Sequence, residues 1–443
     1  MAMAVIVAFP VEQGLCASAR YEIIDLGVFG GGDESRAFSI NDLGQVVGWS
    51  AAPPVGDQRA FLWENGVMQD LGALDKGRSE AWSINNSGQI VGSLIGPHGK
   101  YYPFLWENNA MVQLPGGEGY ALSINDQSQA VGHSDSTNNG PCMWESGGIS
   151  AINTFGFEGG TAYGINDSGQ VVGRAYAGAG SEHAFLWEDG IVTDLGTLPD
   201  YNDYSEATAI NNLGQVVGYS VREEDFPIFP FWRSYQHAFL WEGGAFTDLG
   251  TLGGDNSEAR CINDNGRVVG WADTETSPRA FVYSDGVMAR LDSLLPEDSD
   301  WDYLLWAEGI SNKGQIVGTG RINGEDHAFL MTPVIEGEVD IDPDTLNLSS
   351  KGRWITCYIR LGEDYDVAEI DPCSVLLEGQ IKAAWMRADE EQQVAMAKFD
   401  RREVQTIVGT GEIELTVSGE LISGLEFEGT DTIVVIDQGG KKK

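Results

Sequence analysis

The chain has 443 residues, 42% of them apolar, and a formal net charge of −41 at pH 7. This length exceeds what one compact core supports unless the chain is a repeat array, and the ordinary apolar content excludes a disordered or fibrous protein. The acidic balance argues against nucleic-acid binding, and no stretch after the N-terminus approaches the about 18 apolar residues of a membrane-spanning helix.

The N-terminus, MAMAVIVAFPVEQGLCASAR, has features of a secretory signal. An apolar run at residues 2–11 precedes Ala17-Ser18-Ala19, which is a small-x-small cleavage pattern. The positively charged segment that normally opens such a signal is missing, so the true start codon stays open. We predict a signal peptide at residues 1–19 and no membrane insertion.

The sequence then repeats one pattern seven times. The pattern is Ile-Asn-Asp-x-Gly-Gln-Val-Val-Gly, with small variations, at intervals of 40 to 52 residues. The copies begin at Ile40, Ile84, Ile124, Ile165, Ile210, Ile262 and Ile310. A period of roughly 40–50 residues without helical periodicity is typical of a β-propeller blade. A single small sheet cannot bury both of its faces, whereas sheets stacked around an axis can.

Each copy contains four short apolar or alternating runs, which predict four strands. In the first copy they are Ala37–Ile40, the runs at 45–48 and 60–63, and a run that ends in Asp-Leu-Gly at 70–72. The Asn-Asp-x-Gly turn suits a type I turn closing into a glycine bulge, and Asn65-Gly66 suits a two-residue hairpin. The repeated Asn, Asp and Gly are therefore predicted to be structural.

The two ends of the repeat region complement one another. The seventh copy stops at HAFLMTP, residues 327–333, without a fourth strand, and YEIIDLG at 21–27 is a fourth strand without a third. Pairing of these two segments leaves no open sheet edge there. We therefore predict an all-β fold, with a seven-bladed β-propeller over residues 20–334 that is closed by the N-terminal strand.

His-Ala-Phe occurs at 183–185, 237–239 and 327–329, together with the Asn-Asp-x-Gly and Val-Val-Gly elements. In this combination the repeat resembles the HAF family of extracellular repeats, over about residues 20–333. The resemblance implies a secreted or cell-surface protein of a bacterium or archaeon and implies no known activity. Some copies depart from the family's pattern, which argues against a catalytic role for the His: Arg59 and Arg279 replace His, Tyr102-Pro103 replaces His-Ala, and Cys142 replaces Phe.

The pattern changes after Pro333. Residues 338–437 contain RWITCYIRL, GEIELTVSGEL and DTIVVI, which alternate as strands do, and DRREVQTIV suits one short helical turn. About a hundred residues of this kind predict a small β-sandwich. Residues 438–443 are left as a tail.

Ligand binding is expected on the face of the disc that carries the longer connections, because the tight turns share the other face. The largest insertion is REEDFPIFPFWRSYQ at 222–236, and PDYNDYSEA at 199–207 lies beside it. Aromatic side chains near carboxylates suit sugar rings or peptide anchors. The predicted ligand-binding residues are Tyr201, Tyr204, Phe226, Phe229, Phe231, Trp232, Arg233 and Tyr235. The alternative is an insertion that folds back and buries its own aromatic side chains.

Two short runs place carboxylates at every second position, EDSDWD at 297–302 and DIDPD at 340–344. Their oxygens suit calcium, although neither run has the glycine of an EF-hand loop. The candidate calcium ligands are Asp298, Asp300, Asp302, Asp340, Asp342 and Asp344. No other cofactor is expected, and no His/Cys pair has zinc spacing.

These features predict a monomeric binding or scaffolding module that recognises carbohydrate or protein. One alternative is a glycan hydrolase or lyase that uses Asp200 with Glu206 or Glu258 as acid and base across the axial mouth. Another is a purely structural surface protein. A carboxylate pair converging at the axial mouth would favour the enzyme, and an aromatic patch without such a pair would favour binding.

Overall fold

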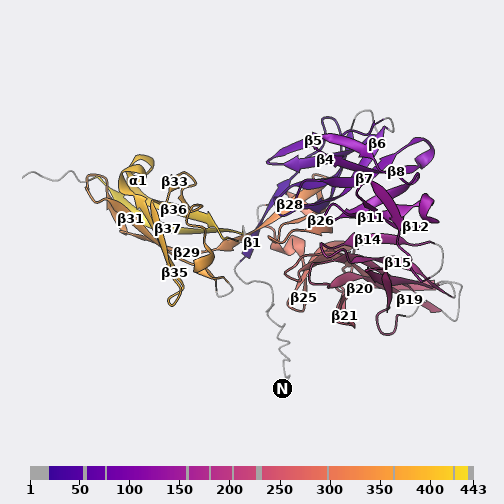
Figure 1. The fold of residues 1–443 in the computed structure, drawn as a ribbon. Helices are drawn as coiled ribbons and strands as arrows, with labels where there is room; N and C mark the ends of the chain where they lie inside the picture. The colour runs from indigo at the N-terminus through magenta and orange to yellow at the C-terminus, as the bar shows by residue number, and fades with distance from the viewer. Residues whose placement is uncertain are drawn as a thin grey trace, which may run out of the picture. The chain divides into compact units, whose positions relative to one another are not determined.

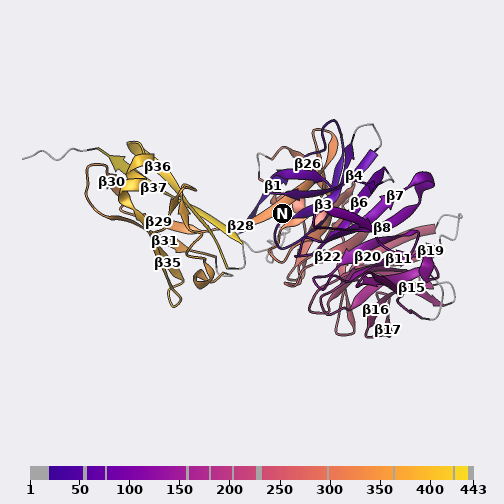
Figure 2. The same cartoon turned by 45° about the horizontal axis from the view of Figure 1, so that its top comes forward.

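The structure, a computed structural model, describes residues 19–437 except 53–56, 75–76, 156–158, 179–180, 202–203, 226–231, 297–298, 363–364 and 423–424. Residues 1–18 of the predicted signal peptide and the tail at 438–443 lie outside the described residues. The chain forms two compact units, drawn in Figures 1 and 2. We call Ile23–Thr332 the N-terminal domain, and Pro333 onwards, with the described residues before Ile23, the C-terminal domain.

In the N-terminal domain, each of the first six copies forms four antiparallel strands that pair in chain order, and one parallel pair, Glu182 with Tyr204, joins the sheets of the fourth and fifth copies. The first three sheets consist of β2 (Ser35–Ile40), β3 (Val46–Ala52), β4 (Asp57–Glu64) and β5 (Val67–Asp70); β6 (Arg78–Ile84), β7 (Ile90–Ile95), β8 (Tyr101–Glu107) and β9 (Ala110–Gln113); and β10 (Gly119–Ile124), β11 (Ala130–Ser134), β12 (Gly140–Glu145) and β13 (Gly148–Ala151). The next three consist of β14 (Thr161–Ile165), β15 (Val171–Gly178), β16 (Ser181–Glu188) and β17 (Ile191–Gly196); β18 (Tyr204–Ile210), β19 (Val216–Asp225), β20 (Trp232–Glu242) and β21 (Ala245–Gly250); and β22 (Ser257–Ile262), β23 (Val268–Asp273), β24 (Pro278–Ser284) and β25 (Val287–Arg290).

The seventh copy receives its last strand from the start of the chain. Its own strands are β26 (Trp301–Ile310), β27 (Ile316–Ile322) and β28 (Glu325–Glu336), and β1 (Ala19–Asp25) pairs with β28. Just beyond β1, the Leu26 N–H donates to Ala328 O at 3.0 Å. The pairing that the sequence predicts between these two segments is therefore present.

The first strands of the copies lie next to one another in chain order, and β26 contacts β2. Sheets that stand side by side in this way form a β-propeller-type fold (Figure 2). Short 3₁₀ helices occur in the connections of both domains: η2 (Pro97–Gly99), η3 (Asp135–Thr137), η4 (Leu291–Leu294) and η5 (Val367–Glu369).

The recurring apolar residues of the repeat form the core between the sheets. The Phe of the third strand is fully buried in six copies, and in the third copy the equally buried Cys142 takes its place. These residues are Phe61, Phe104, Phe185, Phe239, Phe281 and Phe329. The glycine of Val-Val-Gly allows two strands to approach, since a Cβ on Gly48 would lie 1.9 Å from Arg36 O.

The turns have the backbone geometry that their sequences predict. The Gly44 N–H donates to Asn41 O at 3.0 Å, and Gly44 has a φ of 78°. Asn65 and Gly66 have φ of 49° and 80°, as a two-residue type I′ hairpin requires.

The C-terminal domain has two sheets around one apolar core. One sheet runs in the order β29 (Glu338–Asp342), β31 (Trp354–Arg360), β35 (Val394–Asp400) and β34 (Trp385–Asp389). The other contains β30 (Thr345–Asn347), β32 (Leu376–Leu377), β33 (Ile381–Lys382), β36 (Gly411–Glu420), β37 (Glu426–Ile436) and the end of β28. Helix α1 (Arg401–Ile407) begins where Asp400 Oδ1 accepts the Arg402 N–H at 2.8 Å, close to the predicted helical turn. Two sheets that share a core are the packing expected of a β-sandwich.

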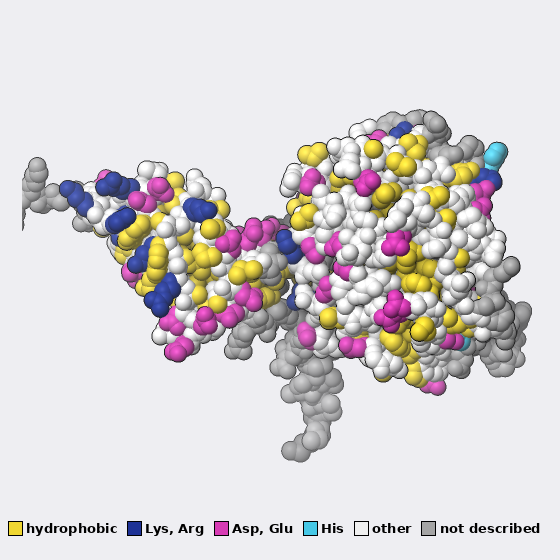
Figure 3. Space-filling model, in the orientation of Figure 1, with side chains coloured by type: hydrophobic (Ala, Val, Ile, Leu, Met, Phe, Trp, Pro, Cys, Tyr) yellow, Lys and Arg dark blue, Asp and Glu magenta, His cyan; other side chains and the backbone are white. Residues whose placement is uncertain are grey.

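Acidic side chains are spread over the face of the N-terminal domain that Figure 3 shows. This distribution agrees with the formal net charge of −41. Within the described residues, no helix has the length and apolar character needed to cross a membrane.

Candidate functional site

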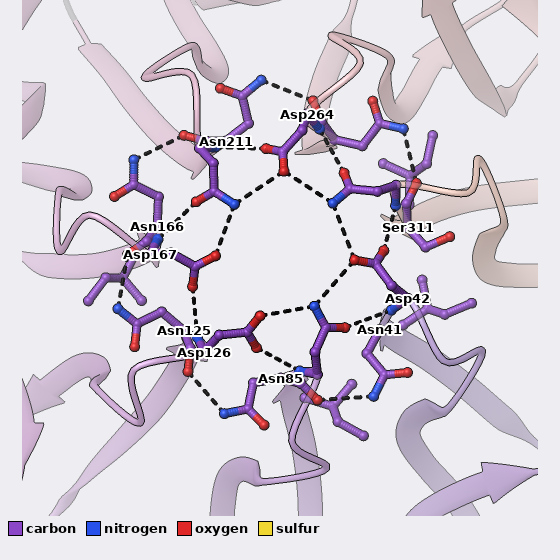
Figure 4. A pocket seen from close by; sticks show the side chains of 18 of the residues that line it. Asn41, Asp42, Asn85, Asn125, Asp126, Asn166, Asp167, Asn211, Asp264 and Ser311 are labelled. Carbon is purple, nitrogen blue, oxygen red and sulfur yellow. Dashed lines mark hydrogen bonds between the residues drawn. The ribbon is translucent and has the colours of Figure 1, made fainter. Parts of the chain in front are cut away.

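The Asn-Asp-x-Gly turns of all seven copies line one small pocket, shown in Figure 4. The second position of the turn contributes a ring of seven side chains, here called the Asn/Asp ring: Asp42, Asn86, Asp126, Asp167, Asn212, Asp264 and Asn312. Asp and Asn alternate around this ring. Because seven is odd, the alternation must fail once, and it does so between Asp126 and Asp167.

Each member of the Asn/Asp ring accepts the backbone N–H of the preceding member through its side-chain oxygen. The seven distances lie between 2.7 and 2.9 Å. The last link, from the Asn312 N–H to Asp42 Oδ1 at 2.8 Å, joins the seventh copy to the first. The three Asn amides also donate to neighbouring Asp carboxylates, so all four carboxylates of the ring are hydrogen-bonded within it.

The Asn before each ring position holds its own turn and the next one. Asn41 Oδ1 accepts the Leu43 and Gln45 N–H groups at 3.1 and 3.0 Å, and its Nδ2 donates to Asn85 O in the second copy at 3.0 Å. Equivalent amide links start from Asn85, Asn125, Asn166, Asn211 and Asn263. These polar groups bond within the protein, so we assign this pocket a structural role, as the sequence predicts.

The His of His-Ala-Phe also has a structural partner. His183 and His237 lie 3.1 and 2.9 Å from Asp194 and Asp248 of the next strand. Each of these carboxylates also accepts the N–H of the Gly two residues later. Where Arg279 replaces His, its Nε lies 3.3 Å from the Asp292 carboxylate. The His of the motif therefore links the third and fourth strands, and Arg279 links its strand to η4, which follows the fourth strand.

A larger cavity of about 690 Å³ lies at the other end of the first strands; we call it the axial cavity. The variable residue of Ala-x-small-Ile lines it in every copy: Phe38, Trp82, Leu122, Tyr163, Thr208, Arg260 and Glu308. The Ile two residues later in each strand lines the pocket of the Asn/Asp ring. The axial cavity therefore lies at the end of the domain that carries the longer connections.

The wall that the first three copies contribute is aromatic. Phe38 and Trp82 stack with ring centroids 4.4 Å apart and an interplanar angle of 14°. Tyr120 meets Tyr101 edge-on at 5.8 Å and stacks on His133 at 5.4 Å. This aromatic wall offers apolar ring faces to a ligand.

Arg174 and Glu206 form one half of a charged wall. Arg174 Nε lies 3.2 Å from Glu206 Oε2, and Arg174 also pairs with Glu182. The Tyr204 hydroxyl donates to Glu206 Oε2 at 2.6 Å. Burial raises the pKa of Glu206, since the Tyr204 hydrogen bond and the Arg174 charge offset only part of the cost of desolvation.

Arg260 holds the other half of the charged wall. Its Nε lies 3.1 Å from Glu258 Oε1 and 3.7 Å from Glu308 Oε2. Burial raises the pKa of Glu308, because the charge of Arg260 opposes this shift only in part and Glu258 adds repulsion. Each guanidinium of the charged wall is therefore shared by two carboxylates.

The second copy adds three polar groups to the lining. Burial raises the pKa of Glu80 despite the charges of Arg78 and Arg36. Ser93 Oγ and Trp82 Nε1 are buried and, among the described residues, have no hydrogen-bond partner. A buried polar atom without a partner costs about 1–3 kcal/mol, so a water or a ligand is expected to satisfy each of them.

Of the predicted ligand-binding residues, Tyr204 lies at the charged wall through its bond to Glu206. Tyr201 is only 6% exposed and belongs to a core cluster. The Arg222 guanidinium lies 5.3 Å from the Tyr201 ring centroid and 5.1 Å from that of Tyr235. Tyr201 and Tyr235 are thus packed on Arg222.

The insertion at 222–236 is mostly an extension of β19 and β20. Its register pairs Arg222 with Tyr235 and Asp225 with Trp232, so a hairpin forms where the sequence suggests a loop. Trp232 and Arg233 lie at the start of β20. Phe226, Phe229 and Phe231 lie outside the described residues.

The residues proposed as acid and base for an enzyme do not all lie together in the structure. Glu206 and Glu258 belong to the charged wall, whereas Asp200 is exposed in a turn and does not line the axial cavity. The candidate calcium ligands Asp300, Asp302, Asp340, Asp342 and Asp344 are exposed, and Asp298 lies outside the described residues. In the part of the chain that is described, no three His, Cys, Asp or Glu side chains are grouped to hold a metal.

The sequence contains a signal for the axial cavity that insertion length does not reveal. Within Ala-x-small-Ile the flanking residues stay the same, while x changes from aromatic to aliphatic to charged. A residue that varies this much does not pack in the conserved core, so its side chain is expected to face a cavity or solvent. The seven lining residues could have been found from this contrast.

No protein-family model and no curated protein matches the sequence. Solved structures with a partial likeness are TolB from Acinetobacter baumannii (8% identity, 57% of this chain and 52% of that chain, TM-score 0.31), a structural genomics protein of unknown function from Bacteroides thetaiotaomicron VPI-5482 (7%, 71% and 76%, TM-score 0.36) and a triple arginine-to-alanine mutant of AofleA from Arthrobotrys oligospora (13%, 72% and 93%, TM-score 0.31). The likeness spans about half the length of TolB. TM-scores of this size assign neither a fold nor a function.

Proposed function

We propose that the N-terminal domain is a closed seven-bladed β-propeller of a secreted or cell-surface protein, and that it binds carbohydrate in the axial cavity. The observation that carries the proposal is the composition of the cavity wall, which is aromatic on one side and charged on the other. Export is supported by the pattern at residues 1–19 and by the resemblance of the repeat to the HAF family.

Two contacts between the first and last copies support closure. His327 Nδ1 lies 2.9 Å from Asp25 Oδ2, which is the link that His183 and Asp194 make within the fourth copy. The hydrogen bond from Asn312 to Asp42 completes the Asn/Asp ring. The first contact supports a fourth-strand role for the N-terminal segment, and the second supports a ring that continues from the seventh copy to the first.

A sugar ring combines a face of C–H groups with a rim of hydroxyls. The aromatic wall around Trp82 suits the C–H face, and Arg174, Glu206 and Glu308 offer donors and acceptors to the hydroxyls. The volume of about 690 Å³ lies within the roughly 300–1,000 Å³ of typical small-molecule sites. A short oligosaccharide is therefore the ligand class that the cavity fits best.

A glycan-binding screen on the purified full chain tests this proposal. Trp82→Ala is expected to weaken binding of the selected glycan by about tenfold or more, because it removes half of the Phe38–Trp82 stack. Trp385→Ala is the matched control, since this indole is 44% exposed on β34 and does not line the cavity. Equal binding by the wild type and Trp82→Ala would place the site elsewhere.

A glycan hydrolase is the second candidate, because the axial cavity contains carboxylates with raised pKa values. Glu206 is 12% exposed and Glu308 is 17% exposed, which is the environment of a protonated general acid. A hydrolase would release reducing ends from the bound glycan, and Glu206→Gln would stop the release without stopping binding. Binding with no release in the wild type would favour the binding module.

A further inference from the structure

The charged wall of the axial cavity has more acids than bases. Arg174 is shared by Glu182 and Glu206, and Arg260 is shared by Glu258 and Glu308. Each guanidinium therefore balances only one of its two carboxylates. The lining as a whole contains three carboxylates, those of Glu80, Glu206 and Glu308, and only two guanidinium groups.

The second copy adds no positive charge to the lining of the cavity. Glu80 lines the cavity, and Arg78 and Arg36 act on it only through their charge. Arg36 is itself held by Glu34 at 2.9 Å, and Arg78 donates to Gln58 at 2.6 Å. Neither guanidinium lines the cavity.

An aromatic wall next to unbalanced carboxylates attracts one kind of ligand group. A cation gains from the negative faces of rings such as Trp82 and Phe38, and it also gains from carboxylates. An anion would have to break the existing ion pairs of Arg174 and Arg260. A neutral sugar would leave the burial of these carboxylates uncompensated, which favours their protonated forms, whereas a cation would stabilise the ionised forms.

We propose that the ligand of the axial cavity carries a protonated amino group, so that the carbohydrate it binds is an amino sugar. The ammonium group lies between the aromatic wall and the carboxylates of Glu206 and Glu308, where it completes the charge balance. Ser93 Oγ, which is fully buried without a partner in the described part of the chain, gains a donor or acceptor from the same ligand. This inference rests on the proposed carbohydrate function and names its substrate class.

The matched probes are a glucosamine trimer, which is cationic, and the N-acetylglucosamine trimer, which has the same backbone and no charge. Calorimetry on the full chain is expected to show at least about tenfold tighter binding of the cationic trimer, with a strong decrease in its affinity as salt is added. Equal affinity for both trimers would overturn the amino-sugar proposal and leave carbohydrate binding intact. Binding of neither trimer, with no glycan selected in the screen, would overturn both.

Substitutions in the charged wall test whether its carboxylates cause the preference for the cationic trimer. Glu308→Gln and Glu206→Gln are each expected to weaken binding of the cationic trimer several-fold more than binding of the neutral trimer, because the glutamine amide can still hydrogen-bond to hydroxyls but no longer pairs with an ammonium group. Glu275→Gln is the control, because Glu275 is exposed in the β23–β24 connection and does not line the cavity. A preference that survives both cavity substitutions would contradict the assignment of the ammonium site.

A peptide of three lysines separates charge from sugar recognition. It carries ammonium groups but no sugar ring, so it is expected to bind more weakly than the glucosamine trimer. Binding as tight as that of the glucosamine trimer would overturn the amino-sugar class and point to a basic peptide. Circular dichroism of each variant confirms that lost binding does not reflect unfolding.

Discussion

Phe38 and Asn41 lie three residues apart on one strand and its turn. The structure requires one particular side chain at the position of Asn41, whereas it allows many at the position of Phe38. Asn41 must accept two N–H groups and donate to the next copy, and no other side chain offers this set of bonds at that length. Phe38 faces a cavity, so its position tolerates Trp, Leu, Tyr, Thr, Arg and Glu in the other copies. Repetition marks the residues that build the fold, and variation marks those that line the site.

Asn125 tests the first half of this contrast. Its Oδ1 accepts the Gln127 and Gln129 N–H groups, and its Nδ2 donates to Asn166 O at 2.9 Å. Asn125→Ala leaves these groups buried without partners and is expected to cost about 1–3 kcal/mol of unfolding free energy. Urea denaturation measures the loss, with the exposed Gln127→Ala as the control.

Ser311 offers the opposite experiment, because it occupies the Asn position of the seventh copy. Its hydroxyl accepts the Gln315 N–H at 3.2 Å, but it has no amide to reach Asn41 O as the other six copies reach their neighbours. Ser311→Asn is expected to add this link and to stabilise the protein by about 1 kcal/mol. Destabilisation by this change would contradict the equivalence of the seven turns.

The lowered pKa of Asp248 implies that the stability of the protein depends on pH. Burial disfavours its ionised form, but the hydrogen bonds from His237 and the Gly250 N–H outweigh this effect and lower its pKa. A carboxyl whose pKa is lowered by folding contributes stability above its unfolded value of about 3.9, and this contribution is lost as the pH falls towards the folded value. Asp248→Asn should therefore flatten the decrease in stability below about pH 4, whereas Asp189→Asn, in an exposed turn, should not.

Elements differ in how far the sequence predicts them. The strands and the Asn-Asp-x-Gly turns follow from the repeat, because turn chemistry and strand alternation are local properties. The β1–β28 pairing is not local, and it is predicted because the two ends of the repeat region lack complementary strands. The extension of β19 and β20 into residues 222–236 is not recognised, since its charged residues do not alternate clearly with apolar ones. Of the axial cavity, only Glu206 is named from the sequence, as an alternative acid or base, because most of the lining is assembled from seven separate strands, one residue at a time.

Deletion of residues 20–28 tests the role of β1 as an element. The deletion removes the partner of β28 and the Asp25–His327 link, so an unpaired sheet edge is exposed. A marked decrease in melting temperature and increased aggregation are expected, as measured by calorimetry and light scattering. If the shortened chain melts like the full-length protein, the closed ring is wrong.

At the scale of the whole molecule, thiol reactivity reports on the packing of both domains. Cys142, Cys261, Cys357 and Cys373 are free, and only Cys373 is exposed. Burial raises the pKa values of Cys142 and Cys357 to about 12, so their reactive thiolate forms are scarce. A thiol reagent should label Cys373 quickly and the other three only after unfolding. Mass spectrometry that finds a bridge between Cys142 and Cys261 would contradict the order of the sheets, since these residues belong to the third and sixth copies.

The central claim concerns the whole N-terminal domain, because the first strands of all seven copies each contribute a residue to the lining of the axial cavity. A crystal structure of the full chain with a bound glucosamine oligosaccharide tests it most directly. We expect the sugar in the axial cavity, with its ring on Trp82 and its amino group near Glu206 and Glu308. Sugar density over the 222–236 hairpin or on the C-terminal domain, with an empty axial cavity, would contradict the account.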